Sequence, residues 1–398
     1  MIHYFNPGHE TAILNASKHY QPPVKQVKMQ RDLAFLPAWY AQPDDFVWIE
    51  EDLTDTFLND IKDLNIRIKT LSINQLENRK NDISTQNIEF WGISPQNLHR
   101  FESIKKKHGL QWQIPLWKEE YRYLGSRLSA HGALSELLES IPALDKTLLP
   151  QVVSQMAEIE AYTAARDETL LVKSPFSSSG RGLVWLPPGL LARSERQIIG
   201  GMLKKQSQVS IEKVLDKEMD FSMHFTIDSE QAVRFAGYSV FQTTEKGAYK
   251  NSCIAAQEVV EKQINSFVDK ELLLQVKNRL LNILQSVYAP HYTGNIGVDL
   301  LVYRTNQAYR LHPCVEINMR KSMGYLAICL QQQYLHPQTQ GVFQIDYEAS
   351  SGALLKKHAL LKQQYPAVFH NGRMVSGYLS LCPVTENSNY HAWFISMR

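Results

Sequence analysis

The sequence predicts a protein of mixed α/β and α+β lobes. Two observations support this fold class. Short apolar strands alternate with helices in the first 115 residues, and long strands with clear polar–apolar alternation follow residue 208. At 398 residues the chain is long enough for two or three lobes, with about 150 residues per domain as a guide. We predict domains over 1–115, 116–208 and 209–398.

The composition excludes several classes of protein. Hydrophobic residues make up 44% of the chain and the formal net charge is only +2, so no nucleic-acid-binding surface is expected. No apolar run is long enough to span a bilayer, and the N-terminus lacks the features of a signal peptide. The four scattered cysteines are typical of free thiols in a reducing compartment. We therefore expect a cytoplasmic protein without nucleic-acid or membrane partners.

The first lobe is predicted to be an open α/β sheet. Its strands are expected over 2–5, 46–49, 66–71 and 88–92, with helices over 11–17 and 96–107. Ligands of such sheets lie beyond the carboxyl ends of the strands, where the first strand is followed by a turn-rich loop. His9 and Glu10 in this loop are therefore candidate site residues. A tight turn with both side chains in solvent is the simpler interpretation.

The middle lobe contains a strand that ends in a lysine and is followed by a loop of small residues. The strand is 170–173, and the loop reads Ser-Pro-Phe-Ser-Ser-Ser-Gly-Arg-Gly before a second strand over 183–186. Small residues let backbone amides approach an anion closely, but no Walker A motif is present. The loop is a candidate flap over phosphates, or alternatively a flexible hairpin tip. Helices are expected over 122–139, 152–165 and 194–205.

The third lobe is predicted to contain long antiparallel strands. In the segment 220–227, Phe221, Met223, Phe225 and Ile227 alternate with polar residues, as in a strand with one buried face. Further strands are expected over 209–215 and 232–241, a polar loop over 245–251, and helices over 269–288 and 324–333. The tail after residue 342 has no clear pattern.

A hairpin over 293–320 carries the main site signal. In its second strand Glu316 and Asn318 share one face, while Val315 and Ile317 are expected to point into the core. Asp299 on the first strand can face the same space if the strands pair. Two carboxylates and an amide oxygen form a set of oxygen ligands that Mg²⁺ prefers. The alternative is a hairpin whose acids simply face solvent.

Pro313 interrupts this second strand. Proline cannot donate a ladder hydrogen bond, so an edge position or a bulge is expected at Pro313. His312 would share the face of Glu316 in a regular strand, and we expect a bulge to change that. A histidine satisfied within the core or at its rim is the simpler interpretation of His312.

Three separated signals therefore occur in order: Lys173 with its loop, the segment Glu212-Lys213-Val214-Leu215 with a later acid, and Asp299 followed by Glu316-Ile317-Asn318-Met319-Arg320. This arrangement resembles the ATP-grasp superfamily, the fold of biotin carboxylase, D-alanine–D-alanine ligase and glutathione synthetase. The resemblance covers roughly residues 120 to 330. It implies two α+β subdomains that clasp ATP, preceded by a Rossmann-like α/β domain.

The resemblance also implies nucleotide-binding roles. Lys173 would contact the ATP phosphates and the adenine side, and Glu212 would lie near the adenine amino group. The flap over the β- and γ-phosphates would be Ser177, Ser178, Ser179, Gly180, Arg181 and Gly182. The backbone of Lys213, Val214 and Leu215 would read the adenine edge. Asp220 is the best match to the acid that binds the ribose hydroxyls, with Glu218 as its rival.

The remaining roles concern metal and phosphate. Asp299, Glu316 and Asn318 match the ligands of two magnesium ions, and Arg320 matches an arginine that steadies a phosphate or acyl phosphate, with Lys321 and Ser322 extending that site. Arg127 stands where the family usually has a second phosphate-contacting lysine. Arginine keeps the charge but has a different geometry. Arg320, Lys173 and Arg181 are the candidate catalytic residues.

The implied activity is ATP-dependent, Mg²⁺-dependent ligation of a small carboxylate, such as an amino acid or peptide, to an amine through an acyl phosphate. The alternatives are a small-molecule kinase and a nucleotide-binding protein without turnover. Substrate specificity would come from loops, with candidates at 6–10, 245–251 and 321–325. A homodimer is the usual expectation for such an enzyme.

Overall fold

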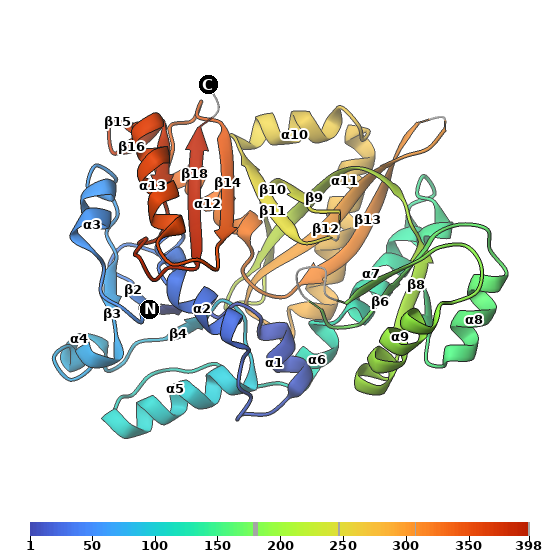
Figure 1. The fold of residues 1–398 in the computed structure, drawn as a ribbon, viewed down its shortest axis with the longest axis horizontal. Coiled ribbons are helices and arrows are strands. Elements are labelled where there is room, and N and C mark those ends of the chain that lie inside the picture. The colour runs from blue at the N-terminus through green and yellow to red at the C-terminus, as the bar shows by residue number, and fades with distance from the viewer. Residues whose placement is uncertain (178–181, 246, 307, 397–398) are drawn as a thin grey trace. The chain divides into compact units, whose positions relative to one another are not determined.

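The computed structural model (Figure 1) describes residues 1–177, 182–245, 247–306 and 308–396. Contacts group the chain into two compact units. The first contains residues 1–118, 250–260 and 320–398, and the second contains residues 119–249 and 261–319. The domain boundaries predicted above stay a prediction. Within the described residues, no helix has both the length and the apolar character needed to cross a membrane, and all four cysteines are free.

The N-terminal part of the first unit is a parallel four-stranded sheet in the order β3-β2-β1-β4, which confirms the predicted open sheet. Its strands are β1 (Ile2–Tyr4), β2 (Phe46–Trp48), β3 (Lys69–Leu71) and β4 (Ile88–Phe90). Its helices are α1 (His9–Asn15), α2 (Val24–Asp32), α3 (Asp55–Ile61), α4 (Lys80–Ile83) and α5 (Pro95–His108). The aromatic core under the sheet includes Tyr4, Trp48, Phe101 and Trp112.

The C-terminal part of the first unit contains antiparallel strands that the sequence did not predict, whereas the helix predicted over 324–333 is present as α12 (Met323–Tyr334). Its strands β11 (Tyr249–Ile254), β14 (Gly341–Tyr347), β18 (Tyr390–Ser396) and β17 (Tyr378–Ser380) are neighbours in that order. The elements α12 (Met323–Tyr334), α13 (Ala353–Gln364), β15 (Val368–His370) and β16 (Arg373–Ser376) accompany them, and α10 (Gln257–Asn265) follows β11. The predicted end of the polar loop over 245–251 is wrong, because β11 already begins at Tyr249.

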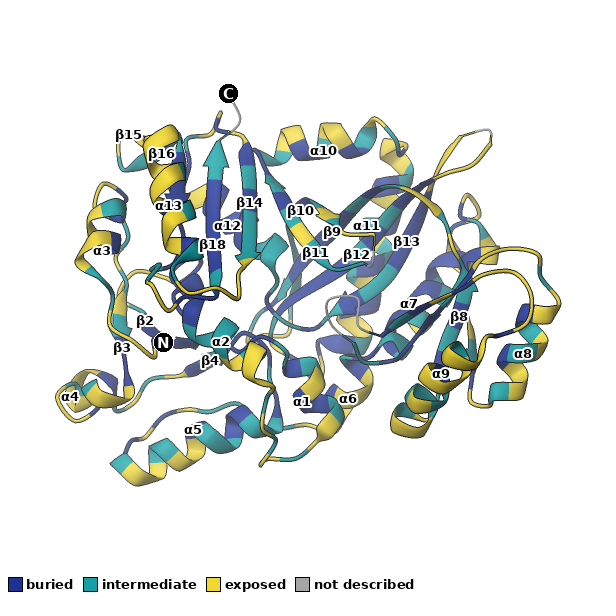
Figure 2. Cartoon of the chain, viewed as in Figure 1, coloured by how far each residue is buried: buried dark blue, intermediate teal, exposed yellow. Residues whose placement is uncertain are grey.

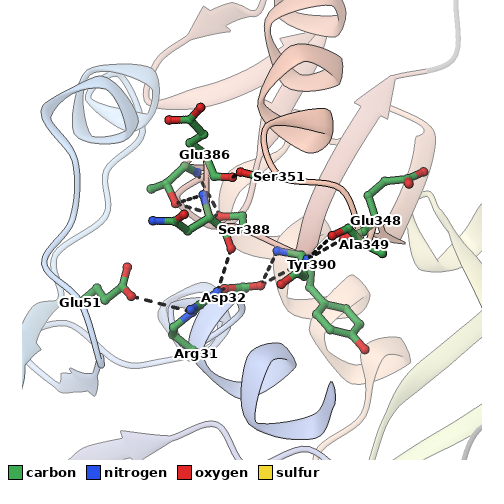
Figure 3. Close-up of polar contacts among 12 residues, drawn as sticks. Arg31, Asp32, Glu51, Glu348, Ala349, Ser351, Glu386, Ser388 and Tyr390 are labelled. Carbon is green, nitrogen blue, oxygen red and sulfur yellow. Dashed lines mark hydrogen bonds and ion pairs between the residues drawn. The ribbon is translucent and has the colours of Figure 1, made fainter. Parts of the chain in front are cut away.

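A buried carboxylate connects the two parts of the first unit (Figure 3). Asp32, at the end of α2, accepts hydrogen bonds through Oδ2 from the backbone amides of Asn389 at 2.7 Å and Tyr390 at 3.0 Å. Its Oδ1 pairs with Arg31 at 2.7 Å, and its side chain is only 3% exposed. These charge-assisted bonds hold the start of β18 against α2.

We expect Asp32→Asn to lower the free energy of unfolding by about 2 kcal/mol, because it weakens the charge-assisted hydrogen bonds to two backbone amides and removes the carboxylate that pairs with Arg31 at 2.7 Å. Urea unfolding would measure the loss. The matched control is Glu51→Gln. Glu51 lies 3.8 Å from the same Arg31 but is 61% exposed, so we expect a change within about 0.5 kcal/mol. Equal effects of the two substitutions would contradict this account of Asp32.

The second unit has two antiparallel sheets. The smaller has the order β5-β8-β6-β7, with β5 (Gln151–Val153), β6 (Leu170–Lys173), β7 (Leu183–Leu186) and β8 (Val209–Lys213). Its helices are α8 (Met156–Ala164) and α9 (Arg193–Gln206). The predicted helix over 152–165 is wrong at its start, because Gln151–Val153 pairs with β8 as a strand. Two adjacent valines at the sheet edge outweigh the helical pattern of the following residues.

The larger strands of the second unit are neighbours in the order β13-β12-β9-β10. They are β9 (Asp216–Ile227), β10 (Val233–Thr243), β12 (Gly294–Arg304) and β13 (Tyr309–Asn318). The apolar residues predicted to be buried in 220–227 are buried, but Ser222 and His224 on the polar face are buried as well, so the strand does not have only one buried face. β9 and β12 are dark blue along most of their length in Figure 2. The helices are α6 (Glu120–Leu124), α7 (Arg127–Ser140) and α11 (Lys270–Ile283), and α11 continues into a π-helical turn over Leu284–Tyr288.

The single helix predicted over 122–139 is divided in two at Gly125. Ser126 has extended backbone angles, and its Oγ accepts a hydrogen bond from the amide of Leu128 at 3.3 Å. A serine in this conformation is a typical N-cap, so a new helix begins at Arg127. α7 then packs on β13. The break therefore places Arg127 in the first turn of α7.

Candidate nucleotide and metal site

Lys173 and Glu212 form a close ion pair in the smaller sheet of the second unit. Lys173 is the last residue of β6 and Glu212 lies on the adjacent β8, diagonally across the register on the same face. The Lys173 Nζ and Glu212 Oε1 atoms are 2.5 Å apart, and the side chains are 10% and 17% exposed. Removing one of two largely buried opposite charges leaves the other uncompensated, which is unfavourable. The structure therefore brings together two residues predicted to contact the nucleotide.

Arg127 connects the flap to the metal hairpin. Its Nη1 donates to the carbonyl of Ser174 at 2.8 Å and to Oγ of Ser177 at 2.6 Å. Its Nη2 lies 3.1 Å from Oε2 of Glu316. The two terminal nitrogens of the guanidinium thus contact both the predicted phosphate-binding flap and a predicted metal ligand.

The base of the flap needs a glycine. The amide of Ser174 donates to the carbonyl of Gly182 at 3.0 Å. A Cβ at Gly182 would lie 2.2 Å from Oγ of Ser174 and 2.4 Å from Cβ of Ser177, so no side chain fits there. Ser178, Ser179, Gly180 and Arg181 lie outside the described residues, and their predicted roles stay predictions.

The three predicted metal ligands lie together on β12 and β13. Asp299 is directly opposite Glu316 in the strand register, and Asn318 Nδ2 donates to Asp299 Oδ2 at 2.9 Å. The other oxygen of Asp299 accepts from Oγ of Ser222 on β9 at 2.6 Å. The sequence alternation already placed Ser222 on the polar face of β9, but its partner could not be predicted without the strand order.

This donor set fits a magnesium ion. The carboxylates of Asp299 and Glu316 and the carbonyl of Asn318 are hard oxygen ligands, and Glu316 is half-buried beside Arg127. Among the described residues, no group of three or more His, Cys, Asp or Glu side chains is arranged as a metal site. Two carboxylates and an amide would leave further positions for phosphate oxygens and water, as Mg²⁺ usually requires.

β13 carries the bulge expected at Pro313, and it is an edge strand. Three residues separate His312 from Glu316, whereas only Leu300 separates Leu301 from Asp299 on β12. Because the bulge adds two residues, His312 keeps the face of Glu316, and the expectation that a bulge would change this face is wrong. Ile317 is buried as predicted, but Val315 is only half-buried because it belongs to the bulge.

The simpler interpretation of His312, a histidine whose ring nitrogens all have hydrogen-bond partners within the protein, is wrong. It is buried, and its Nδ1 has no hydrogen-bond partner among the described residues. Burial lowers the pKa of His312 to about 4. A cavity lies beside it, and its walls also include Arg127, Lys173, Glu212 and Cys314. One cavity therefore touches residues from the flap support, the smaller sheet and the metal hairpin.

The predicted ribose acid and adenine hinge lie where β8 leads into β9. Asp220 Oδ2 accepts from Oγ1 of Thr243 at 2.9 Å and pairs with Lys217 at 2.6 Å, while its rival Glu218 pairs with Arg304. In the hinge, the amide of Val214 donates to the carbonyl of Thr169 at 3.0 Å. That amide is engaged within the protein, and the predicted roles of Lys213 and Leu215 stay predictions.

In the first unit, Glu10 and Arg320 form an ion pair, with Arg320 Nε and Glu10 Oε1 2.7 Å apart. Both His9 and Glu10 are largely buried, so the simpler interpretation of a solvated turn is wrong. Burial alone would raise the pKa of Glu10, but His9 and Arg320 lower it to about 2. The His9 ring covers Gly92, where a Cβ would lie 2.4 Å from His9 Cγ.

Lys321 continues this network. Its Nζ lies 2.5 Å from Oε1 of Glu89, and its side chain is buried. The other oxygen of Glu89 lies 2.6 Å from Nδ1 of His3. Burial alone would raise the pKa of Glu89, but Lys321 and His3 lower it to about 2. Arg320 and Lys321, directly after the metal hairpin, are thus paired with carboxylates on α1 and β4, respectively.

We expect His9 to make the protein less stable in mild acid. Burial lowers the pKa of His9 from 6.5 to about 4. Between pH 4 and pH 6.5 the imidazole of His9 is therefore protonated in the unfolded chain but neutral in the folded protein. The stability contribution is complete above pH 6.5 and is lost as the pH falls toward 4. In His9→Gln the pH slope of the unfolding free energy should shrink by up to about 1.4 kcal/mol per pH unit. Urea unfolding at pH 6.5, 5.5 and 4.5 would measure it, and equal slopes would contradict the assignment.

No protein-family model matches the sequence, and a comparison with curated proteins also finds no match. Similar solved structures do exist. The N5-carboxyaminoimidazole synthetase of Staphylococcus aureus, complexed with ADP, is similar at 12% identity and a TM-score of 0.50, covering 100% of this chain and 93% of that one. The biotin carboxylase domain of the Hydrogenobacter thermophilus 2-oxoglutarate carboxylase is similar at 8% identity and a TM-score of 0.50, covering 100% and 86%.

Both of these proteins are ATP-grasp enzymes. The chain has the ATP-grasp fold. The resemblance seen in three sequence signals is therefore confirmed at the level of the fold, and it extends over the whole chain. At these low identities the likeness concerns the fold alone, so the roles of individual residues rest on the contacts described above.

Proposed function

We propose that this protein is an ATP- and Mg²⁺-dependent ligase that joins a small carboxylate, of an amino-acid or peptide-like kind, to an amine through an acyl phosphate. The observation that carries the proposal is that Arg127 connects three polar pairs. It lines one cavity with the Lys173–Glu212 pair, and it contacts Glu316, which lies opposite the Asp299 that Asn318 contacts. These pairs combine nucleotide-binding, phosphate-binding and metal-binding chemistry in an ATP-grasp fold. The similar synthetase was solved with ADP, and the similar carboxylase domain with MgADP and bicarbonate.

In this proposal the chain's own residues position the reactants and neutralise their charge. Lys173 and Glu212 hold the base side of ATP, Asp220 holds the ribose, and Arg127 with the flap holds the phosphates. Asp299, Glu316 and Asn318 would hold Mg²⁺, which when bound offsets charge on the phosphate oxygens. Phosphoryl transfer needs positioning and electrostatic stabilisation and no protein nucleophile.

The reaction has two steps. A carboxylate oxygen of the substrate attacks the γ-phosphorus of ATP, the bond to the bridging oxygen breaks, and ADP leaves. The amine then attacks the carbonyl carbon of the acyl phosphate and inorganic phosphate leaves. Arg320 would steady the acyl phosphate. A closed flap would exclude water, which would otherwise hydrolyse this intermediate.

Hydroxylamine provides the test. The protein is incubated with Mg²⁺, ATP, hydroxylamine and a panel of amino acids and short peptides, and hydroxamate and ADP are measured together. A ligase converts one class of carboxylate to its hydroxamate with one ADP per product. ADP formed without hydroxamate, on a substrate with a hydroxyl group, would favour a small-molecule kinase. The dimer named for the carboxylase domain also leads us to propose a homodimer, which sedimentation would test.

A further inference from the structure

His312 lies in the cavity of the second unit but belongs to none of the sequence signals of the fold. It is 4% exposed, and its Nδ1 has no hydrogen-bond partner among the described residues. Lys173, Glu212 and Arg127 line the same cavity. A buried polar atom without a partner is unfavourable, so its place in a cavity wall indicates a ligand that supplies the partner.

The two ends of this cavity differ in chemistry. At one end Arg127 pairs with Glu316, which lies opposite Asp299 in the strand register. That end suits phosphates and a cation. His312 lines this cavity together with Lys173 and Glu212, and the three residues of the bulge separate it along β13 from Glu316.

The bulge in β13 determines which residue of β12 lies opposite His312. Its two additional residues pair His312 with Leu301 of β12. Opposite residues of an antiparallel pair share a face, so His312 and the half-buried Leu301 lie side by side on the site face. An apolar side chain beside a neutral imidazole suits an aromatic ring that also needs a hydrogen bond.

We propose that His312 recognises the base of the bound nucleotide, with its Nδ1–H donating a hydrogen bond to N7 of the purine ring beside Lys173 and Glu212. This inference rests on the proposed ATP-dependent function. Adenine presents N7 as an acceptor on this edge, and a neutral imidazole has one N–H to donate. His312 would therefore be a specificity residue for the base, while Arg127 and the metal hairpin serve the phosphates.

The test compares a ligand that has the base with one that lacks it. Calorimetry measures the affinity of wild type and His312→Phe for MgADP and for magnesium tripolyphosphate. We expect the substitution to weaken ADP about five- to tenfold, the effect of one hydrogen bond, and to change tripolyphosphate less than about twofold. Equal losses for both ligands, or unchanged ADP affinity, would overturn the assignment.

Two further measurements serve as controls, one for the effect of replacing any buried histidine and one for the case that the variant does not fold. His224→Phe is the matched control, because His224 is a buried histidine of β9 whose Nε2 is already bonded to Oγ of Ser239 at 2.8 Å. We expect it to leave ADP affinity within about twofold. If His312→Phe does not fold, wild type is compared with ADP and its 7-deaza analogue, which lacks N7. A fivefold or greater preference for ADP supports the inference, and equal affinities overturn it.

The inference and the proposed function can fail separately. Hydroxamate formation together with equal losses of ADP and tripolyphosphate in His312→Phe would overturn only the base assignment. ADP binding that depends on His312, without hydroxamate from any carboxylate, would overturn only the ligase.

Discussion

Glu316→Gln will reduce ATP-dependent hydroxamate formation by about a thousandfold and leave the protein folded. The amide has nearly the shape of the carboxylate but lacks the negative charge that faces Asp299 across the hairpin. Metal stabilisation of a transferring phosphoryl group is worth several kcal/mol, and each 1.4 kcal/mol is a factor of ten in rate. The same substitution should remove most of the effect of Mg²⁺ on ADP affinity.

Glu136→Gln is the control for this substitution. Glu136 lies on α7 in the same unit and pairs with Arg279 at 3.0 Å, but both side chains are exposed. Exposed ion pairs contribute little, so activity and Mg²⁺ dependence should stay within about twofold of wild type. Glu316→Gln with more than a tenth of wild-type activity would contradict the metal assignment.

Lys173→Met will have two effects of similar size. It leaves the largely buried carboxylate of Glu212 without its partner 2.5 Å away, and breaking a buried pair in this way costs about 3 kcal/mol of unfolding free energy. It also removes a cation from the nucleotide pocket, which should weaken ADP about thirtyfold, or 2 kcal/mol. Urea unfolding and calorimetry would measure the two effects.

A double variant separates these effects. Lys173→Met combined with Glu212→Gln removes both charges, so most of the lost stability should return, whereas ADP affinity should not. Lys205→Met, at an exposed lysine near the end of α9, should change neither quantity appreciably. If the double variant is as unstable as Lys173→Met alone, the ion pair is not the source of the loss.

Local pattern was enough to predict the strands and the candidate ligands of the second unit. Polar–apolar alternation along β9, β12 and β13 indicates which of their residues share a face, and it predicted that Asp299, Glu316 and Asn318 lie on one surface. Pro313 indicated the bulge, because proline cannot take part in a regular ladder. The count of inserted residues, and hence the face that His312 occupies, depends on strand register and could not be predicted.

Contacts between distant segments were the part that the sequence could not show. Glu10 and Arg320 are 310 positions apart, and Asp32 holds Asn389 and Tyr390 at the far end of the chain. The sequence around one residue of such a pair gives no information about its distant partner, so Glu10 was interpreted as a solvated turn residue. The C-terminal strands were also missed. β15, β16 and β17 have only three or four residues each, too few to establish an alternation, but the seven-residue strands β14 and β18 were missed as well.

The measurement that tests the central claim most directly is thermal unfolding of wild type with ADP, in the presence and absence of Mg²⁺. A ligand that binds only the folded protein adds about 2.7 kcal/mol of stability at a hundredfold excess over its dissociation constant. We predict a clear rise in the unfolding midpoint with ADP and a larger rise when Mg²⁺ is added. No shift at millimolar ADP with Mg²⁺ would contradict a nucleotide site and, with it, the proposed ligase.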